Sequence, residues 1–279
     1  MAGIDMSMVP TDFSFYNLTL ACVKDGSIPR TRLDDAVRRI LRVKFALGLF
    51  DGRTAWPNSS AINDFNRPEF YKTQLEASHQ VLTLLKNKGN VLPLDRNKIT
   101  EANPLIITGP TSNVLSSLNG GWSYTWSGHE PGIYPLNFTN KTILESFRAR
   151  LGSNKIAYFN SSSFDQLYNI DSLLNASTTA SYILVCLGEQ SYTETPGNIN
   201  DLMLDYAQLE LVMQLRSRTR VPIVLALAQG RPRLINLIVD LVDGIIMMFW
   251  SGTEGYVEEA YTFVKLSSVF ASSQWSSIG

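Results

Sequence analysis

Cysteine, histidine and long apolar runs are scarce in this sequence of 279 residues, and each scarcity excludes a class of protein. The two cysteines, Cys22 and Cys186, do not support a disulfide framework, and Cys186 lies in an apolar segment that predicts a buried thiol. His79 and His129 have no Cys or His at ligand spacing, so we expect no metal site and no cofactor. No apolar run reaches the roughly 18 residues that a transmembrane helix requires.

An excess of charge of one sign is also missing. The chain has 24 Lys and Arg against 25 Asp and Glu, which gives a net charge of −1 without a long block of either sign. Nucleic acid and membrane surfaces are therefore not expected as partners. A phosphate loop and a GxSxG elbow are absent too, which argues against a nucleotide-binding domain and an α/β-hydrolase.

Asn-x-Ser/Thr sequons are frequent and favour a secreted or lysosomal protein that carries glycans. They lie at Asn17, Asn58, Asn137, Asn140, Asn160 and Asn175. The N-terminal sequence MAGIDMSMVP has no basic region followed by an apolar core, so it is not a signal peptide. We expect a chain that lacks the true N-terminus of its parent, because that would reconcile the two observations.

The N-terminal fifth of the chain predicts one amphipathic helix and a linker. Apolar residues recur at helical spacing over residues 32–47, with basic residues elsewhere on the surface. Thr31 and Asp34 fit a capping box at its start, and Gly48 fits the stop. Residues 51–68 are rich in Asn, Ser, Pro and Gly and are typical of a linker.

Strand-like and helix-like segments alternate through the rest of the chain. The strand-like runs are residues 104–108, 155–159, 181–186, 222–228 and 244–250. The predicted helices are residues 69–86, 141–151, 205–216, 231–239 and 255–266. This alternation predicts an α/β fold, a mainly parallel sheet flanked by helices on both faces.

Four loops follow predicted strands, so they are expected at the same edge of the sheet. They are residues 109–135, which contain GGWSYTWSG, and residues 187–201, 229–232 and 251–255. Aromatic rings and carboxylates that meet at one edge favour a polar ligand with a flat apolar face. A sugar has both properties.

The loop of residues 187–201 carries the candidate carboxylates. Glu194 is a candidate general acid if Tyr192 and Trp126 partly shield it and raise its pKa. Glu189 and Asp201 are rivals on the same evidence. The alternative for each is a solvated loop carboxylate.

Aromatic and basic residues in the other loops have two interpretations each. Trp122 and Trp126 are candidates for a sugar-stacking platform, or they pack in a core or interface. Arg231 is a candidate clamp for a substrate hydroxyl or carboxylate, or it caps a following helix. His129 and Glu130 form either a catalytic dyad or a surface pair.

Several segments together resemble glycoside hydrolase family 3, the β-glucosidase and exoglucanase family. They are AGIDMSMVP (2–10), GSIPRTRLDDAVRRILRVKFALGLFD (26–51), VLTLLKNKGNVLPL (81–94), GGWSYTWSG (120–128), GEQSYTETPGN (188–198), QGRP (229–232) and WSGTEG (250–255). These segments occur in the order found in the family and cover about residues 2–260.

The resemblance implies a retaining glycosidase that hydrolyses O-glycosyl bonds with two carboxylates roughly 5 Å apart. It implies that Glu194, the second glutamate of GE-x-x-Y-x-E, is the acid/base. It implies that Trp126 stacks on the sugar, with Trp122, Glu189 and Arg231 as further substrate-binding residues. The expected ligand is a β-glucoside or a β-glucan oligosaccharide.

The chain departs from the family pattern at two places. Residues 196–198 read Pro-Gly-Asn where Lys-Gly-Asp is common, and no Asp-Trp pair, the family's nucleophile motif, occurs anywhere in the sequence. A complete (β/α)₈ barrel needs about 250 residues, so the N-terminal segment is expected to be a remnant of one. The expected product is a truncated β-glucosidase that is inactive alone.

The expected domains follow from the resemblance. They are a barrel remnant (1–50), a linker (51–68), an α/β-sandwich domain (69–266) and a Ser-rich, disordered tail (267–279). The remnant's apolar face is expected to drive self-association. Two other functions stay open: a non-catalytic sugar-binding protein that uses Trp122 and Trp126, and a flavodoxin-like domain suggested by the alternating pattern.

Overall fold

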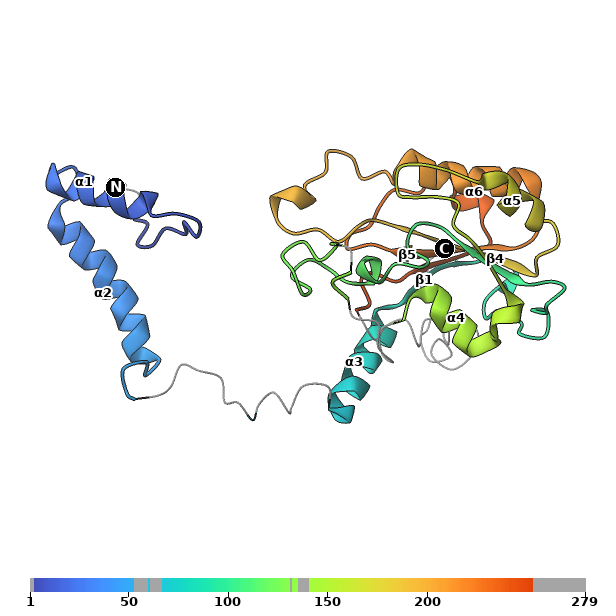
Figure 1. Cartoon of the computed structure of the whole chain (residues 1–279), viewed down its shortest axis with the longest axis horizontal. Helices are drawn as coiled ribbons and strands as arrows, with labels where there is room; N and C mark the ends of the chain where they lie inside the picture. The colour runs from blue at the N-terminus through green and yellow to red at the C-terminus, as the bar shows by residue number, and fades with distance from the viewer. Residues whose placement is uncertain (1–2, 53–59, 61–66, 131, 135–140, 253–279) are drawn as a thin grey trace, which may run out of the picture. The chain divides into compact units, whose positions relative to one another are not determined.

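The structure, a computed structural model, describes residues 3–52, 60, 67–130, 132–134 and 141–252 (Figure 1). It consists of two compact units, Met1–Arg67 and Pro68–Gly279. Most of the predicted linker, the predicted helix 255–266 and the tail 267–279 lie outside the described residues. None of the described helices is long and apolar enough to cross a membrane.

The described part of the first unit contains two α-helices, α1 (Ser14–Lys24) and α2 (Arg30–Ala46). Helix α2 confirms the helix predicted from residues 32–47, and α1 was not predicted. The predicted capping box at Thr31 is wrong, because Pro29 is the N-cap and no side chain caps the helix. Gly48, at φ 69°, follows the last turn as expected from a C-terminal stop.

An ion pair joins α2 to the chain before α1. Arg32 donates to Asp5 (2.8 Å) and to the carbonyl of Ile4 (2.8 Å), and Arg39 lies 3.6 Å from the second oxygen of Asp5. Asp5 of the AGIDM segment therefore has structural partners in α2.

The second unit is built on a six-stranded sheet in the order β1-β6-β5-β4-β2-β3. All neighbouring strands are parallel except β1, which pairs antiparallel with β6. The strands are β1 (Thr83–Asn87), β2 (Leu105–Thr108), β3 (Ile156–Phe159), β4 (Tyr182–Gly188), β5 (Ile223–Ala228) and β6 (Gly244–Met247). The α-helices among the described residues of this unit are α3 (Pro68–Val81), α4 (Ile143–Leu151), α5 (Ile170–Ala176) and α6 (Tyr206–Arg218).

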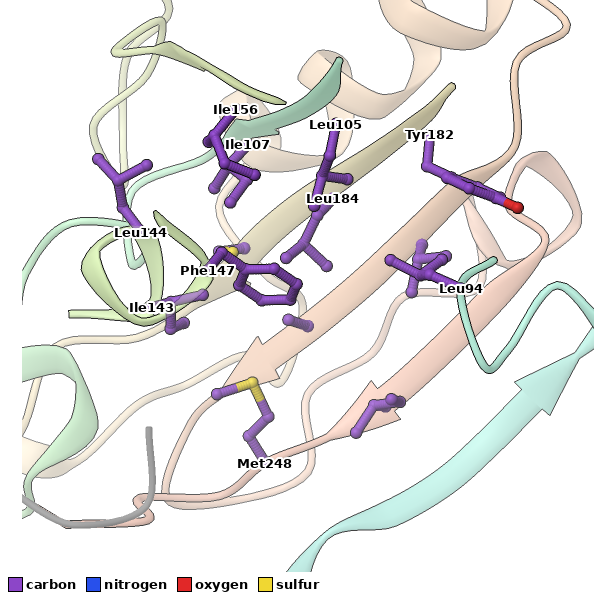
Figure 2. Packing of buried hydrophobic residues seen from close by; sticks show 14 of the residues in the cluster. Leu94, Leu105, Ile107, Ile143, Leu144, Phe147, Ile156, Tyr182, Leu184 and Met248 are labelled. Atoms are coloured by element: carbon purple, nitrogen blue, oxygen red, sulfur yellow. The ribbon is translucent and has the colours of Figure 1, made fainter. Parts of the chain in front are cut away.

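Helices cover both faces of this sheet, which confirms the predicted α/β sandwich. Alternate residues of β2, β4, β5 and β6 point to opposite faces, as the two-residue period of a strand requires. Helix α4 packs on one face, where Phe147 is fully buried among strand residues such as Ile107 and Leu184 (Figure 2). Helices α5 and α6 pack on the other face through Leu173 and Leu209, among others (Figure 1).

One predicted helix is confirmed but ends early, and another is wrong. The helix predicted at 69–86 ends at Val81, because residues 83–87 form the edge strand β1 against β6. Residues 231–239 are irregular, since Leu234 forms a bridge with Met203 and its amide donates to the carbonyl of Leu202 (2.8 Å). The short helix α5 was not predicted.

Candidate active site

The acidic loop, residues 189–198, begins at the carboxyl end of β4, where a buried side chain holds the backbone. Gln208 of α6 is fully buried, and its side-chain amide both donates to the carbonyl of Gly188 and accepts from its amide, each at 2.9 Å. One side chain therefore satisfies both backbone groups where the central strand ends. The loop begins at a rigid position on the sheet.

Glu189 joins this loop to the arginine loop, residues 229–233. Its carboxylate accepts hydrogen bonds from the amide of Gly230 (3.1 Å), from Arg231 Nε (3.3 Å) and from Arg233 Nη1 (2.8 Å). The side chains of Glu189 and Arg233 are both 9% exposed. Arg233 also donates to the carbonyls of Leu202 and Met203. Glu189 thus acts first as an anchor between β4 and β5.

Arg231 also contacts an aromatic ring of the acidic loop. Its Cζ lies 3.7 Å from the centroid of the Tyr192 ring, in a cation–π contact. The Tyr192 ring meets Trp250 edge to face, with centroids 4.8 Å apart. Burial raises the pKa of Tyr192, and the charge of Glu189 raises it further. The phenol therefore stays neutral at physiological pH.

Hydrogen bonds to the side chain of Glu130 hold the tryptophan loop, residues 120–130, together. Its carboxylate accepts hydrogen bonds from Ser127 (2.6 Å) and Thr125, and these bonds lower the pKa of Glu130 to about 2. The amide of Trp122 donates to the carbonyl of Trp126 (3.0 Å). The side chains of Trp122 and Trp126 remain 69% and 43% exposed. These hydrogen bonds hold two indoles at the surface.

The tryptophan and acidic loops contact each other directly. Thr193 donates from its hydroxyl to the carbonyl of Trp126, and His129 Nδ1 lies 3.3 Å from the carbonyl of Ser191. His129 and Glu130 do not form a hydrogen-bonded dyad, since Glu130 is bonded to its own loop.

A pocket of about 290 Å³ lies where the three loops meet. Its lining includes Trp126, Glu189 and Arg231, so the structure brings three of the predicted site residues together. Trp122 and Glu194 are not part of the lining, although Thr193 and Pro196 on either side of Glu194 are. A sugar ring in this pocket would meet an indole, a guanidinium and several backbone groups.

Glu194 is exposed, and its side chain has no hydrogen bond or ion pair within the described ranges. The expected shielding by Tyr192 and Trp126 is therefore not found. Its backbone, at φ 49° and ψ −140°, lies where residues other than glycine are rare. Asp201 differs, because its carboxylate accepts from the amide of Met203 (2.8 Å). Across the described part of the chain, no group of three or more His, Cys, Asp or Glu is placed to hold a metal.

Comparison with known families identifies this arrangement. Residues 82–260 match the glycosyl hydrolase family 3 C-terminal domain. The chain belongs to glycosyl hydrolase family 3.

Relatives within family 3 are much longer than this chain. It is 35% identical to the lysosomal β-glucosidase of Dictyostelium discoideum, covering 91% of this chain and 31% of that protein. It is 26% identical to the periplasmic β-glucosidase of Salmonella typhimurium, covering 91% and 35%. The chain therefore spans about a third of the length of these curated relatives.

Solved structures of family 3 enzymes share the fold. An exo-1,3/1,4-β-glucanase from a Pseudoalteromonas species matches with a TM-score of 0.70 at 27% identity, covering 92% of this chain and 31% of that one. A β-glucosidase from Listeria innocua, solved in complex with glucose, matches with a TM-score of 0.73 at 21% identity, covering 95% and 34%.

Two residues of this family 3 site were missed at the level of sequence. Arg233 is the second arginine of Gly-Arg-Pro-Arg, and its pairing with Glu189 depends on the approach of two loops. Trp250 was read as part of a motif without a role of its own. The sequence signal for the role of Trp250 was Gly120 and Gly230, since each of these glycines leaves room for the Trp250 ring.

Proposed function

We propose that this chain contributes the acid/base side of a retaining β-glucosidase site, with Glu194 as the acid/base. The proposal rests on a comparison of the three candidate carboxylates in residues 187–201. Glu189 is held by two arginines and Asp201 by a backbone amide, whereas Glu194 is exposed beside the pocket without such a partner in the described structure. It is the carboxylate that remains available to a ligand.

The proposed mechanism uses two steps. Glu194 donates a proton to the glycosidic oxygen while a second carboxylate attacks the anomeric carbon and the C–O bond breaks. Glu194 then takes a proton from water, and the water oxygen cleaves the glycosyl–enzyme bond, which restores the protonated Glu194 and frees the second carboxylate. No Asp-Trp pair occurs in the sequence, so the attacking carboxylate is proposed to lie outside these 279 residues.

The substrate proposed is a β-glucoside or β-glucan oligosaccharide. Trp126 would stack on a sugar ring, with Trp122 beside it, while Arg231 would donate to a hydroxyl. The Listeria innocua enzyme, a fold relative, was also solved in complex with laminaribiose, and the Pseudoalteromonas relative is an exo-1,3/1,4-β-glucanase. These two relatives support a glucose-containing ligand.

The family also suggests the domains of the chain and the location of its parent protein. Residues 1–50 are proposed to be a remnant of a barrel domain, of which the described residues form the helices α1 and α2 and no strand, and residues 69–266 the α/β-sandwich domain. A secreted or lysosomal parent is proposed because relatives are lysosomal and periplasmic β-glucosidases and because sequons are frequent.

An affinity label tests the role of Glu194 without requiring turnover. N-bromoacetyl-β-D-glucosylamine places an electrophilic carbon near the position of a leaving-group oxygen. A carboxylate oxygen would displace bromide and form an ester, which peptide mapping by mass spectrometry locates. We expect labelling at Glu194 that laminaribiose blocks and that Glu194→Gln abolishes.

The matched control is Asp201→Asn, which removes a rival carboxylate from the same segment and should keep the labelling. Labelling at Glu189 or Asp201 in place of Glu194 would contradict the proposal. Separately, the purified chain should hydrolyse an aryl β-glucoside negligibly. Measurable turnover that disappears in Glu194→Gln would show that the attacking group is within the chain.

A sugar-binding role without catalysis is the second candidate, favoured by the two exposed indoles on the tryptophan loop. Laminaribiose titration followed by tryptophan fluorescence addresses it. Binding that is lost in Trp126→Ala, kept in Glu194→Gln and unaccompanied by labelling of Glu194 would favour this role. Unchanged fluorescence up to millimolar sugar would exclude it.

A further inference from the structure

We propose that Trp250 is a positioning residue whose ring sets the acidic loop against the tryptophan loop and so fixes the location of Glu194. The inference rests on the proposed function, because the location matters to a sugar only if Glu194 acts on it. Trp250 does not belong to the pocket lining. It would therefore act through other residues.

The Trp250 ring lies in a slot walled by two glycines. A Cβ atom on Gly120 would be 2.7 Å from its Cε3, and one on Gly230 would be 2.6 Å from its Cη2. These separations are too short for any larger residue, so the backbones of the tryptophan and arginine loops both rest on the indole. One side chain thereby spaces two loops.

The backbone around Trp250 is held from elsewhere in the unit. The carbonyl of Ser251 accepts from the buried hydroxyl of Ser78 in α3 (3.0 Å), and the amide of Gly252 donates to the carbonyl of Leu118 (2.7 Å). The indole Nε1 is buried and has no hydrogen-bond partner in the described ranges. The ring therefore acts by its shape, from a backbone segment that is held by α3 and by the residue two positions before the tryptophan loop.

Tyr192 transmits this position to Glu194. Its ring meets Trp250 edge to face at 4.8 Å, and a Cβ on Gly197 would lie 2.3 Å from the same ring. Glu194 falls between these two contacts, with a backbone conformation at φ 49° that needs support from its surroundings. Loss of the Trp250 indole would remove one of the surfaces that hold the backbone of Glu194 in place.

Amide hydrogen exchange reports the position of the loops directly and without sugar. The amide of Gly197 donates to the carbonyl of Glu194 (2.9 Å), and that of Gly230 donates to the carboxylate of Glu189 (3.1 Å). In Trp250→Ala we expect both amides to exchange about tenfold faster. Trp250→Phe keeps a flat ring in the slot and should restore slow exchange. Unchanged exchange in Trp250→Ala would overturn the proposal.

A control variant separates positioning from general loss of stability. Tyr182→Leu removes a buried ring at the opposite end of β4, where its hydroxyl accepts from the amide of Asp95 (3.4 Å). At matched distance from its own melting temperature, this variant should leave the exchange of Gly197 and Gly230 unchanged. Equal acceleration in both variants would mean that Trp250 is an ordinary packing residue, and the proposal would fail.

Affinity labelling gives the functional readout. In Trp250→Ala the maximal rate of bromoacetyl-glucosylamine labelling should fall about 100-fold, because a misplaced reacting group loses that much. The half-saturating concentration should change little, and Trp250→Phe should recover most of the rate. A change confined to the half-saturating concentration would overturn the positioning role.

The two measurements fail independently. If the unaltered chain is labelled at a residue other than Glu194, the proposed function is wrong. The exchange of Gly197 and Gly230 in Trp250→Ala would still support or overturn the spacing role of Trp250.

Discussion

The two units of this chain differ in what they do with apolar side chains. In the second unit, the apolar residues of β2, β4, β5 and β6 are buried between α4 on one face and α5 and α6 on the other. In the described part of the first unit, Ala36 is the only apolar residue that is buried, while Phe13, Val43 and Phe45 are all exposed. Helical periodicity alone therefore forms helices, but it does not create a core.

This difference has a physical reason. A helix with an apolar stripe lowers its free energy when the stripe meets a complementary surface, and two helices offer each other little area. The sheet of the second unit offers two faces, so each helix on it buries its stripe. The same kind of substitution should therefore have unequal effects in the two units.

Exposed apolar surface in the first unit should control the association state. The chain is expected to self-associate, because a large exposed apolar patch favours contact with other molecules. Replacing Val43 and Phe45 with lysine should shift the chain towards a monomer in size-exclusion chromatography with light scattering. A dye-silent monomer before any replacement would contradict this expectation.

Truncation of one phenylalanine should distinguish the units by unfolding free energy. Phe147→Ala in α4 should cost about 3–5 kcal/mol, because the ring is fully buried and leaves a cavity. Phe45→Ala in α2 should change it by less than about 0.5 kcal/mol, because that ring is 63% exposed. Urea unfolding of both variants measures the difference, and equal losses would remove the distinction.

Arginine ion pairs should differ in the same direction. Arg233→Met leaves the buried carboxylate of Glu189 with one partner fewer and should cost about 3 kcal/mol. Arg39→Met in α2 removes an exposed guanidinium that pairs with Asp35 and Asp5, and it should lower the free energy of unfolding far less. Thermal unfolding at low and high salt provides the check, since salt should weaken the exposed pair alone.

Helix caps provide a smaller contrast. Thr142 and Glu145 form a reciprocal capping box at α4, with distances of 3.2 and 2.8 Å, so Thr142→Ala should cost about 1 kcal/mol. Thr31 lies inside α2 and caps nothing, so Thr31→Ala should be nearly neutral. A larger loss for Thr31→Ala than for Thr142→Ala would show that the cap of α2 has been assigned wrongly.

Acidification should affect the tryptophan loop late. Hydrogen bonds from Ser127 and Thr125 depress the pKa of Glu130 from an ordinary 4.5 to about 2. Because the folded pKa is the lower one, the stabilisation is complete above pH 4.5 and disappears as pH falls towards 2. Near-ultraviolet circular dichroism of Trp122 and Trp126 should follow this window, and Glu130→Gln should remove the transition.

The sequence predicted the parallel strands well, the edge strand β3 among them, and missed the antiparallel edge strand β1. Parallel strands such as β4 are continuous apolar runs, so composition alone marks them. Strand β1 was taken for part of a helix, because a half-exposed edge strand with a lysine carries no clear two-residue alternation. The false helix at 231–239 had apolar spacing that suits a helix, but Arg233 and Leu234 bond to residues 202–204.

The sequence predicts which loops form the site but not the contacts between them. The meeting of residues 120–130, 189–198 and 229–233 follows from parallel topology. The pairing of Glu189 with Arg233, and the place of Trp250 between two glycines, depend on distances between segments far apart in the chain. No local pattern encodes such distances. The family resemblance predicts Glu194 as the acid/base, and the structure adds that its side chain has no hydrogen bond or ion pair in the described part of the chain.

The slot around Trp250 also sets a rule for altering this domain. Gly120, Gly230 and the indole fit one another, so a loop borrowed from a relative would need a matching ring and a matching glycine. The side chains of Trp122 and Tyr124 lie outside this slot and are largely exposed, although Tyr124 meets Tyr134 edge to face with centroids 5.3 Å apart. Side chains at these tips can therefore be varied singly, whereas the loop bases should be exchanged together.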